Sequence, residues 1–405
     1  MNKSDTVIVF LNFFSVEKEN FMEKNYKMVA KTFFGFEDIL ADELRNLGAM
    51  HVTKGVRSVQ FEGDKGFMYK ANLSLRTALK ILKPIYSFEV RNEKDYYQKL
   101  YQYDWSRLFS AAQTFAIEVT LATDLFNHTQ YMALRAKDAI VDKFRAQEGK
   151  RPNIDTLHPD IQLFIHIQKD NKVIVSLDTS GESLHHRGYR TQTNIAPINE
   201  VLAAGILLLS GWEGQSDFLD PMCGSGTFLI EAAMIACNIP ASLHRKEFAF
   251  EKWADYDVDL FETIFDSSLG KAKEFSHQLY GYDKAPSAVM KAKENVKNAQ
   301  LSEYITIRQQ DFFKSKKEND KPLFMVFNPP YGERLEINPQ VFYQQIGDTL
   351  KRGYTNTQAW FITSNLEALK SVGLRPSHKI KLFNGKLESR LVNYTIYEGS
   401  KKVKQ

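Results

Sequence analysis

The chain has 405 residues, of which 43% are hydrophobic, and this length is enough for two or three domains with buried cores. The composition excludes a disordered chain. The 53 basic and 49 acidic residues give a net charge of only +4, so a surface for a polyanion must come from local clustering of basic side chains. Two cysteines, Cys223 and Cys237, are too few for a disulfide framework or a cysteine-rich zinc site, and no apolar run approaches the length of a membrane span. We therefore expect a multidomain protein of the reducing cytoplasm, with no membrane segment and no metal.

The first part of the chain predicts a small α+β unit. Residues 1–22 do not share the pattern of the residues after them, and Met22 is an alternative start, so we treat them as an N-terminal extension. We place this ferredoxin-like unit at residues 23–90. Its pattern predicts strands at 26–31 and 58–62, helices from Gly35 to Gly48 and at 66–73, and a further strand between 76 and 90.

A second unit comes next, which we place at residues 70–180, overlapping the first. The pattern predicts an aromatic-rich helix up to residue 109, a strand at 114–121, a long helix at 127–147, and a hairpin of strands at 161–168 and 173–177. The long helix carries four basic side chains, which form either an ordinary solvated face or a surface for nucleic-acid phosphates: Arg135, Lys137, Lys143 and Arg145.

Residues 183–190 read as a polar and basic connector to the last domain. This segment holds Arg187 and Arg190 next to Tyr189 and two histidines. Such side chains can grip phosphates and stack on bases. They can equally well pack between two domains, and the residues alone do not decide between these alternatives.

From residue 181 to about 400 the chain predicts an α/β domain. Strands and helices alternate from residue 217 onward, which is typical of a doubly wound parallel sheet, with a charged and aromatic insertion at 240–275. The Asn384-Gly385 pair lies between two strand-like runs and predicts a hairpin. The last strand is therefore expected to be antiparallel, unlike a plain dinucleotide-binding fold.

Three successive strand ends in this domain carry residues suited to a nucleoside. The loop Asp220-Pro221-Met222-Cys223-Gly224-Ser225-Gly226 lets the backbone approach a ligand at the start of a helix. Leu229 replaces the third glycine of the dinucleotide fingerprint, and no Walker lysine is present after the loop. Asp283 can accept both hydroxyl protons of a ribose, and Asp311 can accept from an adenine amino group. The three together favour a nucleoside with a short charged tail and no phosphate, which is S-adenosylmethionine.

The segment Asn328-Pro329-Pro330-Tyr331 comes directly after an apolar strand at 323–327, at the edge where open α/β sheets bind ligands. The Asn328 side-chain carbonyl and the Pro329 backbone carbonyl can accept the two protons of an exocyclic amine, which frees its lone pair for a methyl donor. Tyr331 can stack on the base. A base inside a helix would first have to leave its stack. Metal catalysis lacks ligands at useful spacing, and covalent attack by Cys223 is disfavoured because this thiol lies in the cofactor loop.

The two motifs, from Asp220 to Thr227 and from Asn328 to Leu335, closely resemble those of the bacterial large-subunit rRNA guanine-N2 methyltransferase family, L type. The resemblance covers nearly the whole chain from about Met22. It implies a class I methyltransferase domain with S-adenosylmethionine as cofactor, and a preceding THUMP domain that binds RNA. The implied cofactor contacts are Asp220, Cys223, Gly224, Ser225, Gly226, Asp283, Asp311 and Asn328. The implied catalytic residues are Asn328, Pro329, Pro330 and Tyr331, and the implied RNA contacts are Arg135, Lys137, Lys143, Arg145, Arg187 and Arg190.

The Asn-Pro-Pro-Tyr motif is shared by enzymes that act on adenine N6, guanine N2 and other amino nitrogens, so only the resemblance implies guanine N2 of 23S rRNA. The alternatives are a tRNA guanine-N2 or a DNA adenine-N6 methyltransferase, or a non-catalytic RNA-binding factor for ribosome assembly. Some family members carry a second domain that makes 7-methylguanine. This chain ends at Gln405, so we do not expect that activity here.

Overall fold

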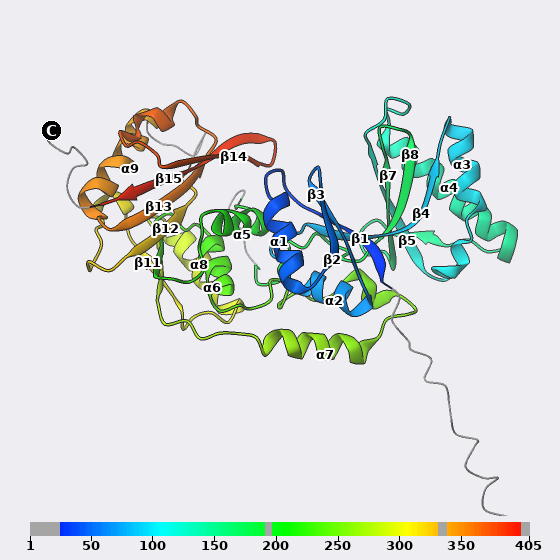
Figure 1. The fold of residues 1–405 in the computed structure, drawn as a ribbon, viewed down its shortest axis with the longest axis horizontal. Coiled ribbons are helices and arrows are strands. Elements are labelled where there is room, and N and C mark those ends of the chain that lie inside the picture. Colours follow the sequence, from blue (N-terminus) through cyan, green and yellow to red (C-terminus); the bar gives the residue numbers. More distant parts are fainter. Residues whose placement is uncertain (1–24, 191–196, 331–337, 398–405) are drawn as a thin grey trace, which may run out of the picture.

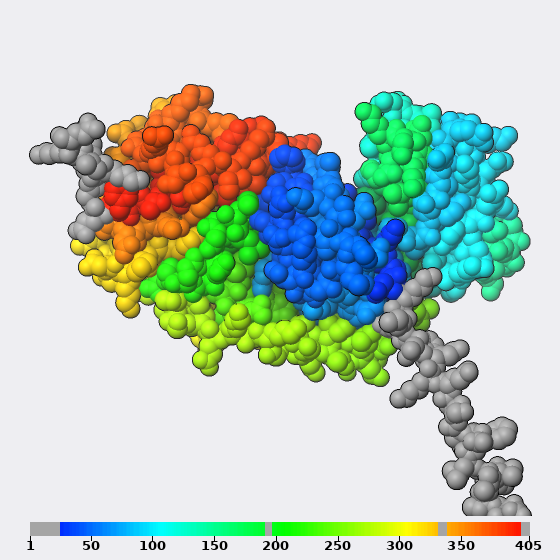
Figure 2. All heavy atoms as spheres, in the orientation of Figure 1, coloured from blue at the N-terminus to red at the C-terminus, as the bar shows by residue number. Residues whose placement is uncertain are grey.

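The computed structural model describes residues 25–190, 197–330 and 338–397. Figure 1 shows an elongated molecule with one sheet in the N-terminal half, coloured blue to green, and another in the C-terminal half, coloured green to red. In Figure 2 the blue ferredoxin-like part lies between the THUMP region and the C-terminal half.

The N-terminal sheet has eight strands in the order β2-β3-β1-β4-β8-β7-β5-β6. Its central strand, β4, pairs antiparallel with β1 on one side and with β8 on the other, so one sheet runs through both N-terminal units. The strands are β1 (Tyr26–Lys31), β2 (Met50–Gly55), β3 (Ser58–Gly63), β4 (Lys80–Glu89), β5 (Thr114–Leu121), β6 (Asn153–Ile154), β7 (Ile161–Ile167) and β8 (Lys172–Asp178). The helices are α1 (Glu37–Leu47), α2 (Lys65–Ser74), α3 (Glu93–Gln102) and α4 (Thr129–Glu148).

Most of these elements arise from local sequence signals. Helix α1 buries Leu40 and Leu44, and it ends at Gly48, whose left-handed φ of 102° lets its backbone N–H bond back to the last turn. The prediction of one helix up to residue 109 was wrong. Helix α3 ends at Gln102, and the buried Trp105 indole donates to the Leu100 carbonyl at 2.8 Å. This contact turns the chain into a short 3-10 helix, η1 (Trp105–Arg107).

The C-terminal sheet has seven strands in the order β11-β10-β9-β12-β13-β15-β14. Strand β9 pairs parallel with β10 and β12, whereas β15 pairs antiparallel with β13 and β14, which confirms the mostly parallel sheet with an antiparallel last strand. The strands are β9 (Asp217–Asp220), β10 (Leu279–Asp283), β11 (Ile305–Gln309), β12 (Leu323–Phe327), β13 (Thr357–Thr363), β14 (His378–Asn384) and β15 (Leu387–Ile396).

Helices cover both faces of this sheet. One apolar core joins Phe218 and Val326 of the sheet to α5 (Glu200–Leu209), α6 (Thr227–Ala236) and α8 (Pro286–Asn298). The core of the opposite face joins Met325 and Phe327 to α9 (Pro339–Gly353), η3 (Phe312–Lys314) and η5 (Ala368–Val372). This is the doubly wound arrangement that the alternating pattern predicted.

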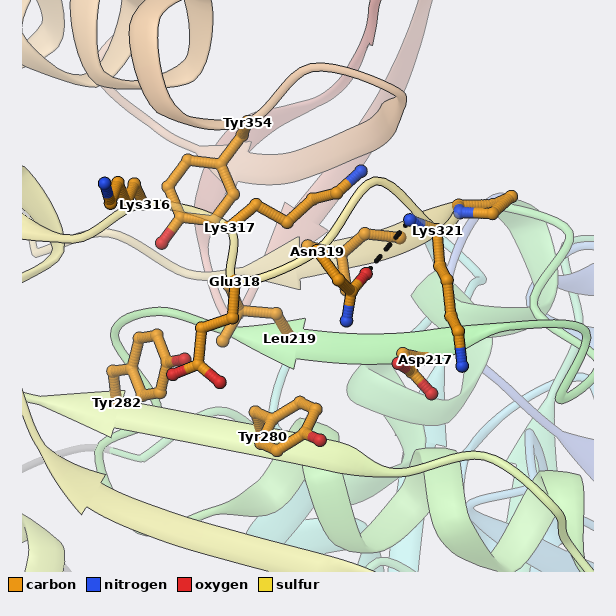
Figure 3. Close-up of a pocket in the computed structure, with 12 residues that line it drawn as sticks. Asp217, Leu219, Tyr280, Tyr282, Lys316, Lys317, Glu318, Asn319, Lys321 and Tyr354 are labelled. Carbon is orange, nitrogen blue, oxygen red and sulfur yellow. Dashed lines mark hydrogen bonds between the residues drawn. The ribbon is translucent and has the colours of Figure 1, made fainter.

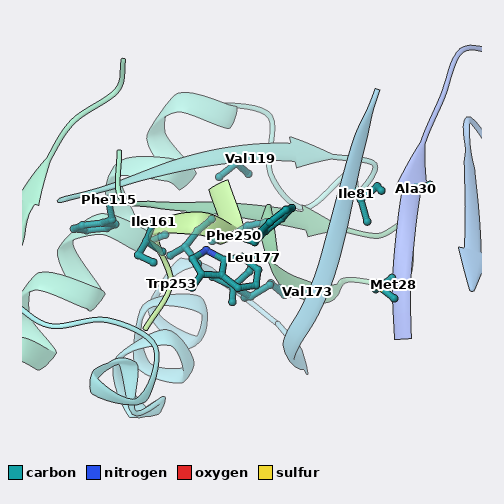
Figure 4. Packing of buried hydrophobic residues seen from close by; sticks show 14 of the residues in the cluster. Met28, Ala30, Ile81, Phe115, Val119, Ile161, Val173, Leu177, Phe250 and Trp253 are labelled. Carbon is teal, nitrogen blue, oxygen red and sulfur yellow. The ribbon is translucent and has the colours of Figure 1, made fainter. Parts of the chain in front are cut away.

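The insertion at 240–275 joins the two halves of the molecule. It forms η2 (Ala249–Lys252) and α7 (Val258–Leu269), and the buried Phe250 ring lies 4.5 Å from the Tyr69 ring of α2. Phe261 of α7 also packs on Tyr69, at 5.6 Å. Figure 4 shows Phe250 and Trp253 among side chains of β5, β7 and β8. The insertion therefore fills part of the N-terminal core.

Candidate functional site

The predicted cofactor residues lie at the ends of neighbouring strands of the C-terminal sheet. Gly281 of β10 pairs with Asp220 of β9, and Asp283 pairs with Gln309 of β11, two residues before Asp311. Strand β12 flanks β9 on the other side and leads directly into Asn328. Because these four strands are parallel, the structure brings the glycine loop, both aspartates and the amide to one edge of the sheet.

The loop after β9 is held by backbone geometry. Gly224 and Gly226 adopt the positive φ values of 53° and 82°, which non-glycine residues rarely adopt. The Gly224 N–H donates to Asp283 Oδ2 at 3.0 Å. A residue that the sequence did not reveal, Asn295 of α8, donates from Nδ2 to the Ser225 carbonyl at 3.0 Å. The loop is thus fixed from two neighbouring elements, β10 and α8.

The charge of this edge favours a cationic ligand over a phosphate. Burial raises the pKa of the Asp220 carboxyl well above its ordinary value, and the Asp283 carboxylate adds to this effect, whereas the Met222 N–H that bonds Asp220 lowers the pKa. No cation pairs with Asp220 among the described residues. A positive group of a ligand beside Asp220 would stabilise the ionised form of its carboxyl. Asp311 is half-buried, and its Oδ1 accepts from the Phe313 N–H at 3.0 Å.

Asn328 presents an acceptor without a partner. Its side-chain oxygen is buried and has no hydrogen-bond partner among the described residues, although such groups are almost always paired in proteins. Pro329 is buried and Pro330 is half-buried, so the turn that carries the amide is tightly packed. Tyr331 lies outside the described residues. An amine placed before Asn328 would supply the missing donor.

The Cys223 thiol is unsuited to nucleophilic attack. It is buried, and its backbone N–H donates to the Tyr282 carbonyl at 2.8 Å. Burial, and after it the carboxylates of Asp220 and Asp283, raise the pKa of the thiol well above its ordinary value. The group therefore stays protonated near neutral pH, where a thiol is a weak nucleophile.

A groove of about 430 Å³, open to solvent, lies elsewhere in the same domain. Figure 3 shows its lining, which includes Tyr280 and Tyr282 of β10, Glu318, and Tyr354. The groove also contains Asp217, at the start of β9, and none of the predicted site residues. It is therefore separate from the edge that carries Asn328.

Comparison with known proteins identifies the family. A sequence model of the RMKL-like methyltransferase domain matches residues 187–393, which is half of the chain. The chain belongs to the RMKL-like methyltransferase family. Before this domain, models of the RlmL ferredoxin-like domain and of the THUMP domain match residues 27–82 and 90–178 of the chain.

Individual relatives of this methyltransferase agree with that assignment. It is 37% identical to the ribosomal RNA large subunit methyltransferase K/L of Aeromonas salmonicida, over 89% of this chain and 53% of that protein. The chain thus spans about half the length of the curated K/L relatives that it matches. A Synechocystis protein named provisionally as an RNA methyltransferase is 35% identical, with 90% of this chain and 95% of that protein covered.

Solved structures show the same fold. The methyltransferase SMU.472, crystallised with SAH, has a TM-score of 0.82 and 29% identity, covering 94% of this chain and all of that one. A protein from Clostridium difficile 630, described as a methylase, has a TM-score of 0.82 and 32% identity, covering 94% of this chain and all of that one. These likenesses confirm the class I methyltransferase fold preceded by ferredoxin-like and THUMP regions.

The predicted RNA contacts of Arg187 and Arg190 are not favoured by this structure, because both side chains bond to other residues of the chain. Arg187 is fully buried, and its Nε lies 3.4 Å from Glu231 Oε1 of α6. The Arg190 side chain is 13% exposed, lies 3.2 Å from Glu200, and donates to Thr227 Oγ1 at 2.6 Å. Connector packing, the other alternative for this segment, is what the structure shows.

These contacts form a stripe along one face of α6. Thr227 and Glu231 bind the two connector arginines, and further along the helix Arg76 donates to the Met234 carbonyl at 3.0 Å. The three positions are spaced as on one helix face. Glu231 is a lone charge in an otherwise apolar helix, which is the sequence signal that could have revealed the buried pair. The helix after the cofactor loop is thus clamped by the connector and by the N-terminal unit.

The basic residues of α4 lie on the surface of the N-terminal half. The Arg135 guanidinium stacks over the Tyr97 ring of α3 at 4.8 Å, and Lys143 lies over Tyr101 at 5.5 Å. Lys137 and Arg145 are partly exposed and pair with neighbouring aspartates of their own helix. Their contact with RNA stays a prediction.

The described residues contain no group of three or more histidine, cysteine, aspartate or glutamate side chains that could hold a metal ion. Within the same residues, no helix combines the length and the apolar character needed to cross a bilayer.

Proposed function

We propose that this chain is an S-adenosylmethionine-dependent RNA methyltransferase that modifies guanine N2 in 23S rRNA. The observation that carries the proposal is the buried Asn328 oxygen, which has no hydrogen-bond partner in the described part of the chain and lies at the same sheet edge as a glycine loop flanked by carboxylates. An amine acceptor beside a site for a cationic nucleoside is what methyl transfer to an exocyclic nitrogen needs.

The cofactor would be held by the loop from Asp220 to Gly226, with the ribose at Asp283 and the adenine at Asp311. The sulfonium of S-adenosylmethionine supplies an electrophilic methyl group. The Asp283 carboxylate would lie near the positive groups of the cofactor, and such a group beside Asp220 would favour ionisation of that buried carboxyl, which suits this donor and disfavours a pyrophosphate. Asp283 already accepts from Gly224 and Ala285, at 3.0 and 2.9 Å, so its orientation is set before the ligand arrives.

Asn328 and Pro329 would act on the acceptor. Their carbonyl oxygens accept the two amine protons, which reduces delocalisation of the nitrogen lone pair into the ring and directs it toward the methyl group. A strong general base is not required, because the amine proton becomes acidic as the new bond forms. Tyr331 would stack on the base after it has left its helix.

The choice of RNA rests on the first half of the chain and on the names of relatives. A THUMP domain precedes the methyltransferase domain, α4 carries basic side chains, and the Aeromonas relative is named for large-subunit rRNA. We propose a cytoplasmic protein that needs no metal, with RNA contacts at Arg135, Lys137, Lys143 and Arg145. We also propose a ferredoxin-like unit at 23–90, a THUMP unit reaching 180 and a methyltransferase domain at 181–400.

Mapping of methyl marks tests the proposal. We expect a deletion strain to lose one N2-methylguanine from 23S rRNA, detected by mass spectrometry of rRNA and tRNA digests, and to regain it with the wild-type gene but not with an Asn328→Ala gene. Loss of a tRNA mark or of DNA N6-methyladenine would favour one of the rival enzymes. If the deletion strain loses no methyl mark, and the Asn328→Ala gene complements the deletion fully, a non-catalytic assembly factor is favoured.

A further inference from the structure

One aromatic pair, in which Phe34 is exposed and Phe383 is half-buried, joins the two halves of the molecule and has no part in the proposed methyl transfer. Phe34, in the loop after β1, makes an edge-to-face contact with Phe383 of β14, with ring centroids 5.7 Å apart. Phe34 is 43% exposed, although its neighbour Phe36 is fully buried. Figure 2 shows the blue N-terminal part touching the red strands of the C-terminal half near the top of the molecule.

The contact between these two halves is tightly packed, so Phe34 is held in place. A side chain at Gly205 of α5 would meet the Phe36 ring at 2.2 Å, which explains the glycine there. Gly35 has a φ of +88°, and a side chain on it would meet Leu382 at 3.3 Å. With Phe36 buried on one side of Gly35, Phe34 is directed outward on the other.

The strand register places Phe383 at the edge that carries Asn328. Phe327 pairs with Phe361 of β13, so Asn328 is level with Ile362, one residue before Thr363. Thr363 pairs with Arg390 of β15, which pairs with Lys381 of β14, and Phe383 lies two residues further along. Counting strand spacings and residues, Phe383 lies roughly 15–20 Å from Asn328. A strand of nucleic acid that delivers a base to Asn328 could reach it.

Cationic side chains flank the pair on the same face of the hairpin. Side chains alternate along a strand, so Lys379, Lys381 and Phe383 share one face of β14. The Lys381 ammonium lies 5.4 Å from the Phe383 ring, and Lys381 and Arg390 share a single acidic partner, Glu388. Three basic side chains thus lie on the Phe383 side of the pair, while on the Phe34 side the Glu37 carboxylate accepts from the Gly35 N–H at 2.8 Å.

Protection of an open sheet edge explains only part of this surface. Strand β14 is the last in its sheet, and lysines on edge strands prevent pairing with other molecules. An exposed aromatic ring such as Phe34 has the opposite effect, because it favours contact with other molecules. Rings flanked by cations are instead the arrangement that proteins use to stack bases and track the phosphates of a single strand.

We infer that Phe34, Lys379, Lys381, Phe383 and Arg390, together called the junction platform, bind single-stranded RNA next to the target base. This inference rests on the proposed function for the identity of the strand. Stacking on the two rings would hold an unpaired nucleotide, and the basic groups would neutralise its phosphates. Because the platform is built from both halves, it would also fix the RNA relative to the methyltransferase domain.

The test compares Leu and Tyr variants of the full chain. Phe34→Leu and Phe383→Leu keep an apolar side chain at the junction but remove the ring, whereas the Tyr variants keep the ring. Fluorescence anisotropy measures binding of a labelled 12-nucleotide oligouridine and of a 12-base-pair RNA duplex, and thermal unfolding checks the fold. Tyr397→Leu is the matched control, because Tyr397 is 44% exposed. It comes after β15, which runs antiparallel to β13, so it lies at the end of the sheet away from Asn328.

We expect each Leu variant to bind oligouridine about 5- to 100-fold more weakly than the wild type, with duplex binding much less affected and the Tyr variants near normal. Unchanged oligouridine affinity in a folded Leu double variant would overturn the inference, and would leave a protein partner as the occupant to test. If the wild type binds oligouridine through these rings but transfers no methyl group to RNA, the platform stands and the proposed function fails. If the Leu variants methylate 23S rRNA with a normal KM, the platform fails and the function stands.

Discussion

The Gly224 backbone N–H donates to Asp283 Oδ2 across 3.0 Å, which ties the loop after β9 to the end of β10. The same carboxylate accepts from the Ala285 N–H at 2.9 Å. One side chain therefore shapes the glycine loop and holds a charge at the proposed ribose position. Replacing this side chain with asparagine removes the charge and one of the two acceptor oxygens, so it tests both effects together.

Asp283→Asn should weaken binding of S-adenosylmethionine by about tenfold or more, because bonds to a charged group contribute about 1.5–3 kcal/mol. Isothermal titration calorimetry measures the change. Asp259→Asn, on the exposed face of α7, is the matched control and should bind normally. An unaltered Kd for Asp283→Asn would remove Asp283 from the cofactor site.

Asn328→Ala should bind the cofactor normally but lose about 10²- to 10³-fold in kcat, the size of effect seen when one preorganised polar group of a transition state is removed. Single-turnover methylation of 23S rRNA transcribed in vitro, together with calorimetry, distinguishes this loss from a loss of cofactor binding. Gln358→Ala, an exposed amide on β13, serves as control. Equal rates in Asn328→Ala and wild type would refute the acceptor role.

Reversing the charges of Lys143 and Arg145 to Glu should weaken RNA binding and flatten its salt dependence. If both residues contact phosphates of a single strand, the slope of log K against log salt should fall in magnitude by about 1.4. Affinities measured between 50 and 300 mM KCl give the slope. The same slope in variant and wild type would show that α4 is an ordinary solvated helix face.

Glu200 should make the stability of this chain depend on pH. Burial raises its pKa to about 7, against the lowering effect of Arg190, while Glu231 raises it and Arg187 lowers it. Between about pH 4.5 and 7, Glu200 therefore keeps its proton in the folded protein, whereas in the unfolded chain, with a pKa near the ordinary 4.5, it has lost that proton. Stability contributed by this proton is complete below about pH 4.5 and is lost as pH rises toward 7.

Urea unfolding at several pH values tests this sign. Over that window the wild type should lose up to about 3 kcal/mol more than Glu200→Gln. The exposed Glu213→Gln should behave like the wild type. Parallel curves for wild type and Glu200→Gln would contradict the assignment.

Phe250→Ala should destabilise the N-terminal half, although Phe250 comes after the glycine loop of the methyltransferase domain in the chain. Its ring is fully buried against Tyr69, and the loss of such a ring costs about 3–5 kcal/mol. Hydrogen exchange should show faster opening of β7 and β8. The control Val258→Ala lies at an exposed position and should change little. Unchanged protection in β7 and β8 would show that the insertion does not brace this core.

The elements that could be predicted from sequence are those with strong local signals. Strand β12 is a run of five apolar residues ended by two prolines, and the prediction of 323–327 is confirmed residue for residue. The helix expected after the glycine loop is also confirmed, because the apolar α6 begins directly after that loop at Thr227. The edge that gathers Asp220, Asp283, Asp311 and Asn328 results from the parallel order of such elements.

The features that were missed depend on contacts between distant segments. Strand β2 carries mostly exposed side chains, so it has no apolar pattern, and it forms only because it pairs with β3. The polar character of residues 183–190 left open whether this connector binds RNA or packs between two domains. Arg187 is nevertheless buried, because its charge is matched by Glu231, which is distant in the chain. Sequence patterns report the polarity of a residue but not the partner that allows its burial.

The shared strand β4 has a consequence for anyone who wants to transplant the THUMP unit into another enzyme. A fragment that starts at residue 90 would leave β8 without its neighbour β4, and the unpaired sheet edge would promote aggregation. The smallest fragment that could be transferred would have to begin at β1, so the ferredoxin-like and THUMP units would have to be moved together.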